Sequence, residues 1–381
     1  MITDFLQPLN NDILNFIKGL SSQHLGSKIV LHDANHFPDL EKIKIAIIGV
    51  KENRGDTTAN KDVNLDYIRK ELYNLYSGNW NETIADLGDI FAGNEIKDTY
   101  FALQKTCNSL IKKKIIPIII GGSQDLTYPM YRAYDTLEQM VNLISIDSKF
   151  DFGKDDNPIS EESYLTKIII DEPNNLFNYS NIGYQSYYNS QEEIDLIEKL
   201  YFDAYRLGEV SNNLAISEPI FRDADLVSID LKSVQSSFSA NFKNFMPNGF
   251  NGKEICALSR YAGISDKVSA IGIFNHSNTF QESILIAQII WYFIEGYHYR
   301  SNEYPFSTKE NYLKYIVPID DDEIIFYKSN KTDRWWIEIK YITGNKLNKN
   351  SLMPCTHNDY LAACNQEIPE RWWKAQRKNS V

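Results

Sequence analysis

The sequence predicts an α/β fold in which a mainly parallel sheet is covered on both faces by helices. From residue 43 onward, short apolar runs of strand length alternate with longer segments of helical periodicity, which is typical of such a sheet. Most of the short runs are too uniformly apolar for a sheet with one face in water. With 381 residues, of which 43% are hydrophobic and 24% charged, the chain can bury a sizeable core.

Each expected strand is a short run rich in aliphatic residues. These runs are Ile43–Val50, Ile84–Leu87, Ile115–Ile120, Val141–Ile146, Ala204–Leu207, Leu226–Ile229 and Val268–Ile273. Between them, apolar residues at three- and four-residue spacing predict helices over Leu65–Tyr76, Ile96–Ile111 and Ile284–Tyr297. Such helices are expected to pack on the sheet.

The two ends of the chain lie outside this alternating pattern. Residues 1–42 predict a helix and an extended arm, residues 43–300 the α/β domain, and residues 301–381 a C-terminal extension. In the extension, Glu323–Tyr327 and Trp335–Ile339 predict a β-hairpin, and the tail ends in helix. The sequence has no internal repeat or low-complexity linker, which favours additions that pack on one central domain.

Charge and hydropathy exclude several classes of protein. A net charge of −12 opposes binding to phosphate backbones or anionic lipid, so nucleic acid is not an expected partner. No run approaches the roughly 18–20 apolar residues of a membrane span, and the chain does not begin like a signal peptide. We therefore expect a cytoplasmic protein. The four cysteines form no CxxC pair, which favours buried thiols over zinc or redox chemistry.

Polar residues follow three of the predicted strands, at the edge where open parallel sheets bind ligands. The three segments read Ile120-Gly121-Gly122-Ser123-Gln124, Ile146-Asp147-Ser148-Lys149-Phe150-Asp151 and Ser228-Ile229-Asp230-Leu231-Lys232. These segments are the strongest candidates for a functional site.

In these three segments the sequence resembles the ureohydrolase family, which includes arginase, agmatinase and especially formimidoylglutamase. Members carry Gly-Gly-x-His, Asp-x-His-x-Asp and Ser-x-Asp-x-Asp segments in this order, and the spacing agrees here over roughly residues 43–300. The resemblance implies an arginase-like three-layer αβα sandwich. It also implies hydrolysis of a guanidino or formimino C–N bond by a hydroxide bridging two manganese ions, which two histidines and four aspartates hold.

The chain departs from the family at the ligand positions themselves. Gln124 and Lys149 stand where the two histidines are expected, and Lys232 stands where the last aspartate is expected. The remaining ligand positions are Asp147, Asp151 and Asp230. No histidine lies between residues 36 and 276 that could replace the missing imidazoles.

A second family motif, Glu-x-Asn after the last strand, is also altered. Ile273 takes the place of the glutamate that contacts the substrate's basic group in relatives. His276 lies nearby and is a weak candidate for an acid or base, although a structural hydrogen-bonding role is favoured for a single histidine in such a loop.

Electrostatics favours lysine ammonium groups over metal ions at this site. Two Mn²⁺ with three aspartates and two lysines would leave a net charge of plus three, whereas the five side chains alone carry minus one. A lysine ligand must also lose its proton, which neighbouring carboxylates oppose. We expect Lys149 and Lys232 to form ion pairs with the three aspartates and no metal to bind. If an ion binds, its ligands are Asp147, Asp151 and Asp230.

The favoured interpretation is a degenerate formimidoylglutamase-like protein, a pseudoenzyme without a cofactor that acts in binding or as a scaffold. Its expected partner is an unidentified protein or a small guanidino- or formimino-type ligand, and a ligand sensor that does not turn over substrate fits equally well. The alternative is a hydrolase of a linear amidine or guanidino substrate such as formimidoylglutamate, with an altered site that uses Mn. The resemblance also implies a homo-oligomer.

Overall fold

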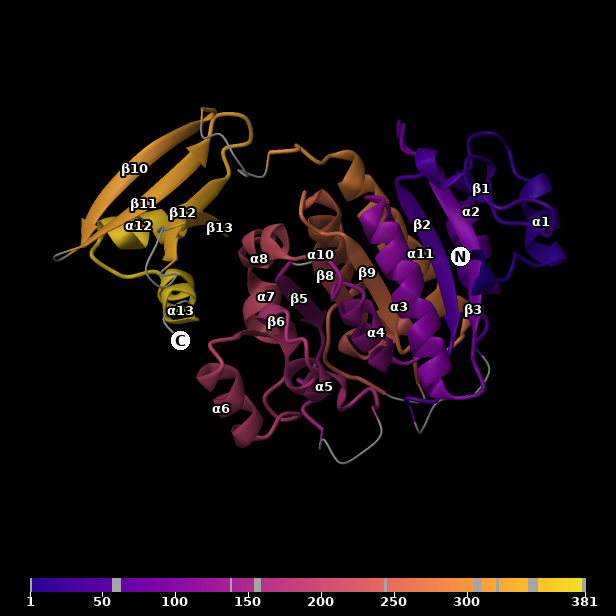
Figure 1. The fold of residues 1–381 in the computed structure, drawn as a ribbon, viewed down its shortest axis with the longest axis horizontal. Helices are drawn as coiled ribbons and strands as arrows, with labels where there is room; N and C mark the ends of the chain where they lie inside the picture. Colours follow the sequence, from indigo (N-terminus) through magenta and orange to yellow (C-terminus); the bar gives the residue numbers. More distant parts are fainter. Residues whose placement is uncertain are drawn as a thin grey trace.

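The computed structural model describes residues 2–56, 63–137, 139–153, 159–242, 245–303, 310–319, 322–341 and 349–378. Its main body is a nine-stranded, all-parallel sheet with the strand order β1-β3-β2-β4-β9-β8-β5-β6-β7 (Figure 1). The strands are β1 (Val30–Leu31), β2 (Ile45–Lys51), β3 (Ile84–Phe91), β4 (Ile116–Ile120), β5 (Val141–Ile146), β6 (Leu176–Tyr184), β7 (Asp203–Arg206), β8 (Leu226–Asp230) and β9 (Ala270–Phe274). The predicted α/β class with a parallel sheet is confirmed.

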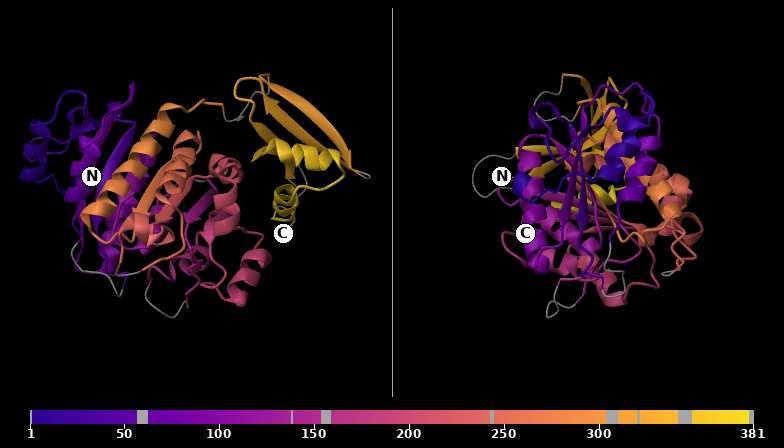
Figure 2. Two further views of the ribbon diagram at one scale, coloured as in Figure 1. Left: turned by 180° about the vertical axis from the view of Figure 1, so that it is seen from behind. Right: turned by 90° about the vertical axis from the view of Figure 1, so that its right-hand side faces the viewer.

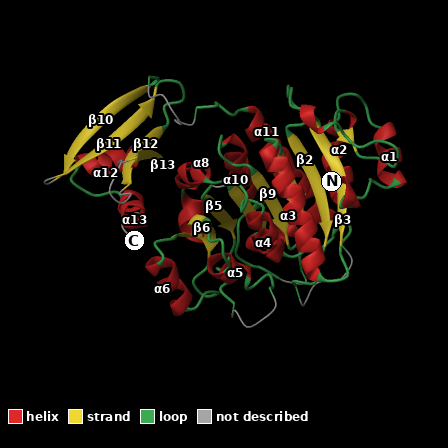
Figure 3. Cartoon of the chain, in the orientation of Figure 1, coloured by secondary structure: helices red, strands yellow, loops and turns green. Residues whose placement is uncertain are grey.

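Helices cover both faces of this sheet, as the cartoon in Figure 3 and the rear view in Figure 2 show. They are α1 (Asn11–Lys18), α2 (Asp66–Asn74), α3 (Ile96–Lys112), α4 (Thr127–Arg132), α5 (Tyr164–Ile170), α6 (Gln191–Lys199), α7 (Leu207–Asn212), α8 (Glu218–Asp223), α9 (Ser236–Ser239), α10 (Gly252–Ile264) and α11 (Phe280–His298). Alternate residues of β2 enter opposite cores: Ile45 and Ile47 pack in the core with α2, α10 and α11, and Ala46 and Ile48 with α3, α4 and α5. The sheet is therefore the middle layer of a three-layer αβα sandwich.

Two strands of this sheet were not expected from the sequence. The short strand β1 lies in the N-terminal arm and pairs with β3. Strand β6 lies between β5 and β7, and polar side chains interrupt its apolar pattern. These side chains have partners in the fold: Asn178 Nδ2 donates to Asp203 Oδ2 at 3.0 Å, and Asn181 Nδ2 donates to the carbonyl of Lys149 at 2.7 Å. A strand whose polar residues are satisfied by tertiary contacts carries a weak periodic signal.

The C-terminal extension contains a second, four-stranded antiparallel sheet with the order β10-β11-β12-β13. Its elements are β10 (Tyr312–Ile319), β11 (Asp322–Ser329), β12 (Trp335–Tyr341), β13 (Lys349–Cys355), α12 (His357–Cys364) and α13 (Glu370–Lys378). The predicted hairpin corresponds to β11 and β12, so the hairpin was right but incomplete. Trp335 and Trp336 point to opposite faces of the sheet, and both are buried.

The extension contacts the β7 end of the main body (Figure 1). Arg222 of α8 is buried in this interface, where its guanidinium donates to the carbonyls of Trp335 at 3.1 Å and Cys355 at 2.9 Å. The same guanidinium lies 4.8 Å from the ring centroid of Trp336. A second contact between the extension and the main body is the ion pair of Lys374 of α13 with Asp203 of β7 at 3.5 Å.

Across the residues that the structure describes, no helix is both long enough and apolar enough to cross a membrane.

Candidate functional site

The three aspartates singled out from the sequence lie at the carboxyl edge of the main sheet. Asp147 directly follows β5, Asp230 ends the neighbouring strand β8, and Asp151 lies four residues beyond Asp147. Both strand-end aspartates cap their own turns: Asp147 Oδ1 accepts the backbone N–H of Lys149 at 2.9 Å, and Asp230 Oδ1 accepts that of Lys232 at 2.7 Å. Asp151 has a φ of 58°, in the left-handed region. The parallel register of β5 and β8 thus brings the two segments to one edge.

This cluster is buried and incompletely satisfied. The exposed fractions are 1% for Asp147, 7% for Asp151 and 4% for Asp230. Among the described residues, Asp147 Oδ2 and Asp151 Oδ2 have no hydrogen-bond partner. Burial raises the pKa of Asp147, and burial with the charge of Asp147 raises the pKa of Asp230 to about 7. The pKa of Asp151 is raised well above its ordinary value, first by burial and then by the charges of Asp147 and Asp230.

The ammonium groups of the two lysines do not pair with this cluster as the sequence had predicted. Lys149 extends outward, and its Nζ lies 2.7 Å from Glu162 Oε1, in a pair whose side chains are 43% and 64% exposed. The Lys232 ammonium lies 2.6 Å from Glu161 Oε2 and 3.3 Å from Asp56 Oδ2. Within the described residues, neither ammonium lies within 4 Å of the three aspartates, so the expected direct ion pairs are wrong. The backbone turns that Asp147 and Asp230 cap direct both lysine side chains toward other loops.

Lys232 instead forms ion pairs with residues of two loops near the carboxyl edge of the sheet. Asp56 belongs to the connection between β2 and α2, and Glu161 to the connection between β5 and α5. The same two loops meet through the backbone, because the N–H of Glu161 donates to the carbonyl of Gly55 at 3.2 Å. Burial opposes the charged form of Lys232, but Asp230, Glu161 and Asp56 outweigh burial and raise its pKa above the ordinary value. Burial raises the pKa of Glu161 to about 7 despite this ion pair.

Gln124 takes the first missing histidine position and lies in a neutral hydrogen-bond network. It is buried, and its Nε2 lies 3.2 Å from Ser145 Oγ, 3.2 Å from Tyr164 OH and 3.4 Å from Ser228 Oγ. Its backbone N–H donates to Asn275 Oδ1 at 3.1 Å. At the position where the family has a histidine, this chain therefore has a neutral amide that contacts hydroxyl groups.

The loop after β9 contains the remaining candidates. Ile273 is buried in β9, so no carboxylate is present at the position of the family's glutamate. Burial lowers the pKa of the His276 ring to about 4, although hydrogen bonding with the backbone of Gly121 and the side chain of Asn278 opposes this shift. A neutral imidazole is therefore expected at physiological pH, and the structural hydrogen-bonding role of His276 stays a prediction.

Sequence reasoning missed the acidic residues that surround this edge. Glu161, Glu162 and Asp56 became relevant only when the fold brought them to the two lysines. Glu282, fully buried in the first turn of α11, accepts hydrogen bonds from the backbone N–H and the hydroxyl of Ser277. Burial and these contacts leave the pKa of Glu282 at about 7. The local sequence signal at Glu282 is that of a helix cap, because Thr279 Oγ1 accepts its backbone N–H at 3.2 Å.

Within the described ranges, no group of three or more His, Cys, Asp or Glu side chains is positioned to hold a metal ion. Asp147, Asp151 and Asp230 are nevertheless the carboxylates that would supply oxygen ligands at this edge, because each is buried and two have an oxygen without a partner.

Comparison with known proteins places the chain in a family. The chain matches the Arginase family over residues 43–293. A curated relative, the formimidoylglutamase of Staphylococcus haemolyticus, is 24% identical over 261 residues, which cover 65% of this chain and 82% of the relative.

Solved structures show the same fold. The formiminoglutamase of Trypanosoma cruzi with Mn²⁺ has a TM-score of 0.61 at 18% identity, over 69% of this chain and 96% of that chain. The formimidoylglutamase of Bacillus subtilis has a TM-score of 0.62 at 17% identity, over 70% and 91% of the two chains. The agmatine ureohydrolase of Thermoplasma volcanium has a TM-score of 0.58 at 18% identity, over 74% and 97%. With a family match over most of its length and this fold, the chain belongs to the arginase family.

Proposed function

We propose that this chain is an arginase-family protein without a dinuclear manganese centre, which acts by binding or assembly and not by hydrolysis. The observation that carries the proposal is Lys232. It replaces a ligand aspartate, and its ammonium is held at 2.6 Å from Glu161 and 3.3 Å from Asp56. A protonated amine cannot ligate a cation, and the surrounding carboxylates oppose its deprotonation.

The other replaced positions support the same interpretation. Two manganese ions a few ångströms apart need several anionic oxygens and imidazoles to offset their mutual repulsion. The amide of Gln124 contacts hydroxyl groups, and the ammonium of Lys149 pairs with Glu162. Three carboxylates then remain for two ions, and this donor set does not fit the dinuclear centre of the family.

Elemental analysis combined with an activity assay tests this proposal. The full chain is purified from manganese-supplemented medium, and its metal content and its hydrolysis of formimidoylglutamate, arginine and agmatine are measured. We expect well under one manganese ion per chain and no release of product above a protein-free control. Two ions per chain with turnover would overturn the proposal.

A matched variant strengthens the test by restoring the family's ligands. The triple substitution Gln124→His, Lys149→His, Lys232→Asp returns two imidazoles and one carboxylate to the site. If the replaced ligands cause the loss of metal, this variant binds manganese while the parent chain does not. A folded triple variant that binds no more manganese than the parent chain would show that the replaced ligands are not the cause.

One observation favours a second candidate function, a C–N hydrolase that uses a single divalent ion. Asp147 Oδ2 and Asp151 Oδ2 are buried without a hydrogen-bond partner among the described residues, and water molecules can complete an octahedron around one Mg²⁺ or Mn²⁺. One bound ion per chain together with turnover would favour this candidate. The binding partner, the oligomeric state and the cytoplasmic location stay predictions.

A further inference from the structure

The sheet of the C-terminal extension has an open edge at strand β10. Among the described strands, β10 pairs with β11 alone, in the order β10-β11-β12-β13. In Figure 1 it is the strand of this sheet that lies farthest from the main body. The family match ends at residue 293, so this edge lies outside the part of the chain that corresponds to the family.

The register of β10 on β11 shows which backbone groups point to this edge. Just before the paired residues begin, the carbonyl of Asn311 accepts the N–H of Asn330 at 2.9 Å. Because hydrogen-bonded positions alternate along an antiparallel pair, the odd-numbered residues of β10 bond to β11 and the even-numbered residues point outward. Tyr312, Lys314 and Ile316 therefore direct their N–H and C=O groups to the edge, and these groups have no partner among the described residues.

Pro318 ends the open edge. It is the next outward-pointing residue, but it has no N–H, and its carbonyl accepts Gln366 Nε2 at 3.1 Å. A row of three residues with alternating donors and acceptors is left, and an added extended strand satisfies such a row. A helix uses its own N–H and C=O groups internally, so it does not match this edge.

The side chains along the edge indicate what the added strand carries. Tyr312, Lys314 and Ile316 share one face of the sheet, on which the Tyr312 ring lies 5.3 Å from that of Trp336. Ile316 is apolar but 54% exposed. Lys314 is exposed and forms no ion pair with any residue that the structure describes. An apolar residue opposite Ile316 and an acidic residue opposite Lys314 complement this edge.

A second copy of this chain matches the edge poorly. Two β10 strands related by a twofold axis use all three outward residues only when Lys314 lies opposite the same lysine of the other copy. Like charges directly opposite each other destabilise a strand pair. Each chain also carries a net charge of −12, which opposes self-association.

We propose that the open edge of β10 binds an extended segment of another protein, which adds an antiparallel fifth strand to the four-stranded sheet. The segment carries an acidic residue opposite Lys314 and apolar residues opposite Tyr312 and Ile316. This inference deepens the proposed function, on which it rests for its biological role, because it names the kind of partner that assembly requires. Manganese takes no part in it.

A synthetic peptide tests the proposal on the full chain. Its sequence is Thr-Val-Thr-Glu-Thr-Val-Thr, with fluorescein at the N-terminus and an amide at the C-terminus, so that its second, fourth and sixth residues lie opposite the three edge residues. We expect saturable binding with a Kd below about 1 mM, measured by fluorescence anisotropy. If this peptide shows no saturable binding, the proposal is wrong.

Two N-methylated peptides show whether binding occurs by strand addition. Methylation of the second, fourth and sixth nitrogens removes the N–H groups that face β10 and should weaken binding at least about tenfold. Methylation of the third and fifth nitrogens affects only N–H groups that face away, and should change the Kd by less than about threefold. An equal loss in the two peptides would contradict strand addition.

An exchange of charges tests the role of Lys314. A peptide with lysine in place of the glutamate should bind about two- to fivefold more weakly, the effect expected of one cross-strand charge pair. The variant Lys314→Glu should reverse this preference. If the preference for the glutamate peptide persists in the variant, the pairing with Lys314 is wrong.

A variant of the edge locates the site. Ile316→Pro removes an outward N–H and should weaken binding at least about tenfold. The sheet should still fold, because proline is tolerated in an edge strand where its nitrogen faces outward. The matched control Ile368→Ser removes an apolar side chain of similar exposure, 49%, from the connection between α12 and α13, and should leave the Kd unchanged.

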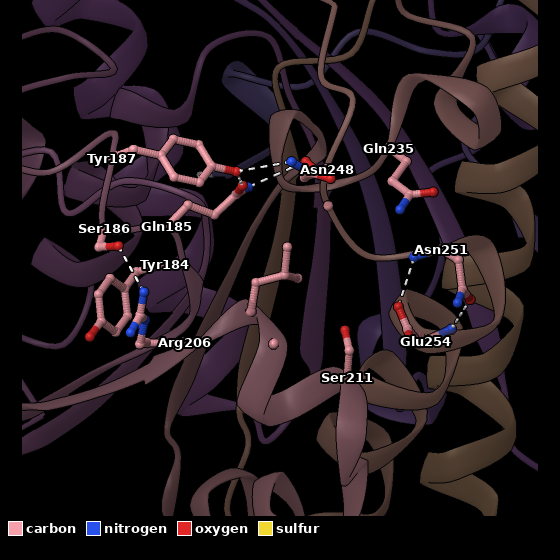
Figure 4. Close-up of a pocket in the computed structure, with 13 residues that line it drawn as sticks. Tyr184, Gln185, Ser186, Tyr187, Arg206, Ser211, Gln235, Asn248, Asn251 and Glu254 are labelled. Atoms are coloured by element: carbon pink, nitrogen blue, oxygen red, sulfur yellow. Dashed lines mark hydrogen bonds between the residues drawn. The ribbon is translucent and has the colours of Figure 1, made fainter.

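Arg206 of the main body is the other candidate for binding the peptide's glutamate. It lines a pocket of about 380 Å³ (Figure 4), and among the described residues its guanidinium has one hydrogen-bond partner, Ser186 Oγ at 2.9 Å. Arg206→Met should leave the Kd unchanged. Binding that is lost in Arg206→Met but kept in Ile316→Pro would overturn the assignment to β10.

Failure of this inference is distinguishable from failure of the proposed function. A chain that binds two manganese ions, turns over substrate and still passes the peptide tests would contradict the proposed function but not this inference. A metal-free chain that fails the peptide tests would contradict this inference alone.

Discussion

The main body contains two buried acidic clusters that differ in how their charge is compensated. In the first, Asp86 and Asp89 of β3 lie beside the fully buried Arg69 of α2. Arg69 Nε donates to Asp86 Oδ2 at 2.9 Å, and its Nη2 forms an ion pair with Asp89 Oδ1 at 2.7 Å. In the second cluster, Asp147, Asp151 and Asp230, the described residues place no cation within ion-pair distance.

The carboxyl groups respond to this difference in opposite ways. Burial alone would raise the pKa of Asp89, but Arg69 and Lys51 outweigh burial and lower it below its ordinary value. Burial and mutual repulsion raise the pKa of Asp151 and of Asp230. Arg69 therefore compensates the charge of the paired cluster, whereas the unpaired cluster costs folding free energy whenever it is ionised. Such a cost is typical of a site retained for, or inherited from, ligand binding.

The largest effect is expected from removing the cation of the paired cluster. Arg69→Met leaves two buried carboxylates uncompensated and should lower the free energy of unfolding by about 3–5 kcal/mol, measured by urea denaturation at pH 7.5. The control is the triple variant Arg69→Met, Asp86→Asn, Asp89→Asn, which should recover part of the loss. A loss below about 1 kcal/mol in the single variant would show that Arg69 does not compensate the charges of Asp86 and Asp89, and that the two clusters do not differ in this way.

A smaller loss is expected from Lys232, whose ammonium is partly buried between two loops. Lys232→Met leaves Glu161 and Asp56 without their cation and should cost about 1–3 kcal/mol, because both carboxylates are largely buried. The matched variant Glu161→Gln should lose less, since it removes a carboxylate whose pKa burial already raises to about 7. Equal losses in the two variants would contradict this ranking.

Removing a carboxylate from the unpaired cluster should stabilise the protein. Asp230 has a pKa of about 7 in the fold, against roughly 3.9 in the unfolded chain, so its folded form binds its proton more tightly. The contribution of Asp230 to the free energy of unfolding therefore falls as the pH rises from about 4 to about 7. Asp230→Asn does not titrate and keeps the oxygen that accepts the N–H of Lys232.

This variant should gain at least about 1 kcal/mol over the wild type at pH 8, and the gain should shrink steadily toward pH 4. Unfolding by urea at four pH values measures both quantities. A gain that does not depend on pH, or a loss at pH 8, would show that the cluster is compensated after all.

The smallest effect is expected from the exposed lysine of the site. Lys149 pairs with Glu162 at 2.7 Å, but the side chains are 43% and 64% exposed, and pairs of this kind contribute about 0–1 kcal/mol. Lys149→Met should change the unfolding free energy by less than about 0.5 kcal/mol, as read from thermal melts in low salt. A loss as large as that of Lys232→Met would mean that exposure does not distinguish the two lysines.

The fold could be predicted because its signal is local. Runs such as Ile45–Lys51 and Ile116–Ile120 are apolar on both faces, which only a sheet between two helical layers satisfies. Strand β6 escaped because Asn178 and Asn181 find their partners in distant segments. Strands β10 and β13 escaped because each contains a proline, Pro318 and Pro354, which weakens the sequence signal of a strand.

The site could be predicted only in part, because the positions of its aspartates follow from local sequence whereas the partners of its lysines lie in distant segments. Motif order placed Asp147 and Asp230 correctly at one edge, since strand ends of a parallel sheet lie together. The partners of the lysines could not be predicted, because a lysine side chain reaches several ångströms and the backbone turns at Asp147 and Asp230 decide its direction. Glu161 and Asp56 lie far from Lys232 in the sequence and meet it only in the fold.

Thermal unfolding of the EDTA-treated full chain, with and without 1 mM MnCl2, tests the central claim most directly, because a ligand that binds only the folded state raises the melting temperature. If the replaced ligand positions leave the chain without a manganese pair, the two melting temperatures agree within about 1 °C. A melting temperature that rises with manganese and saturates, and that the ligand-deleting variant Asp147→Asn abolishes, would contradict the account.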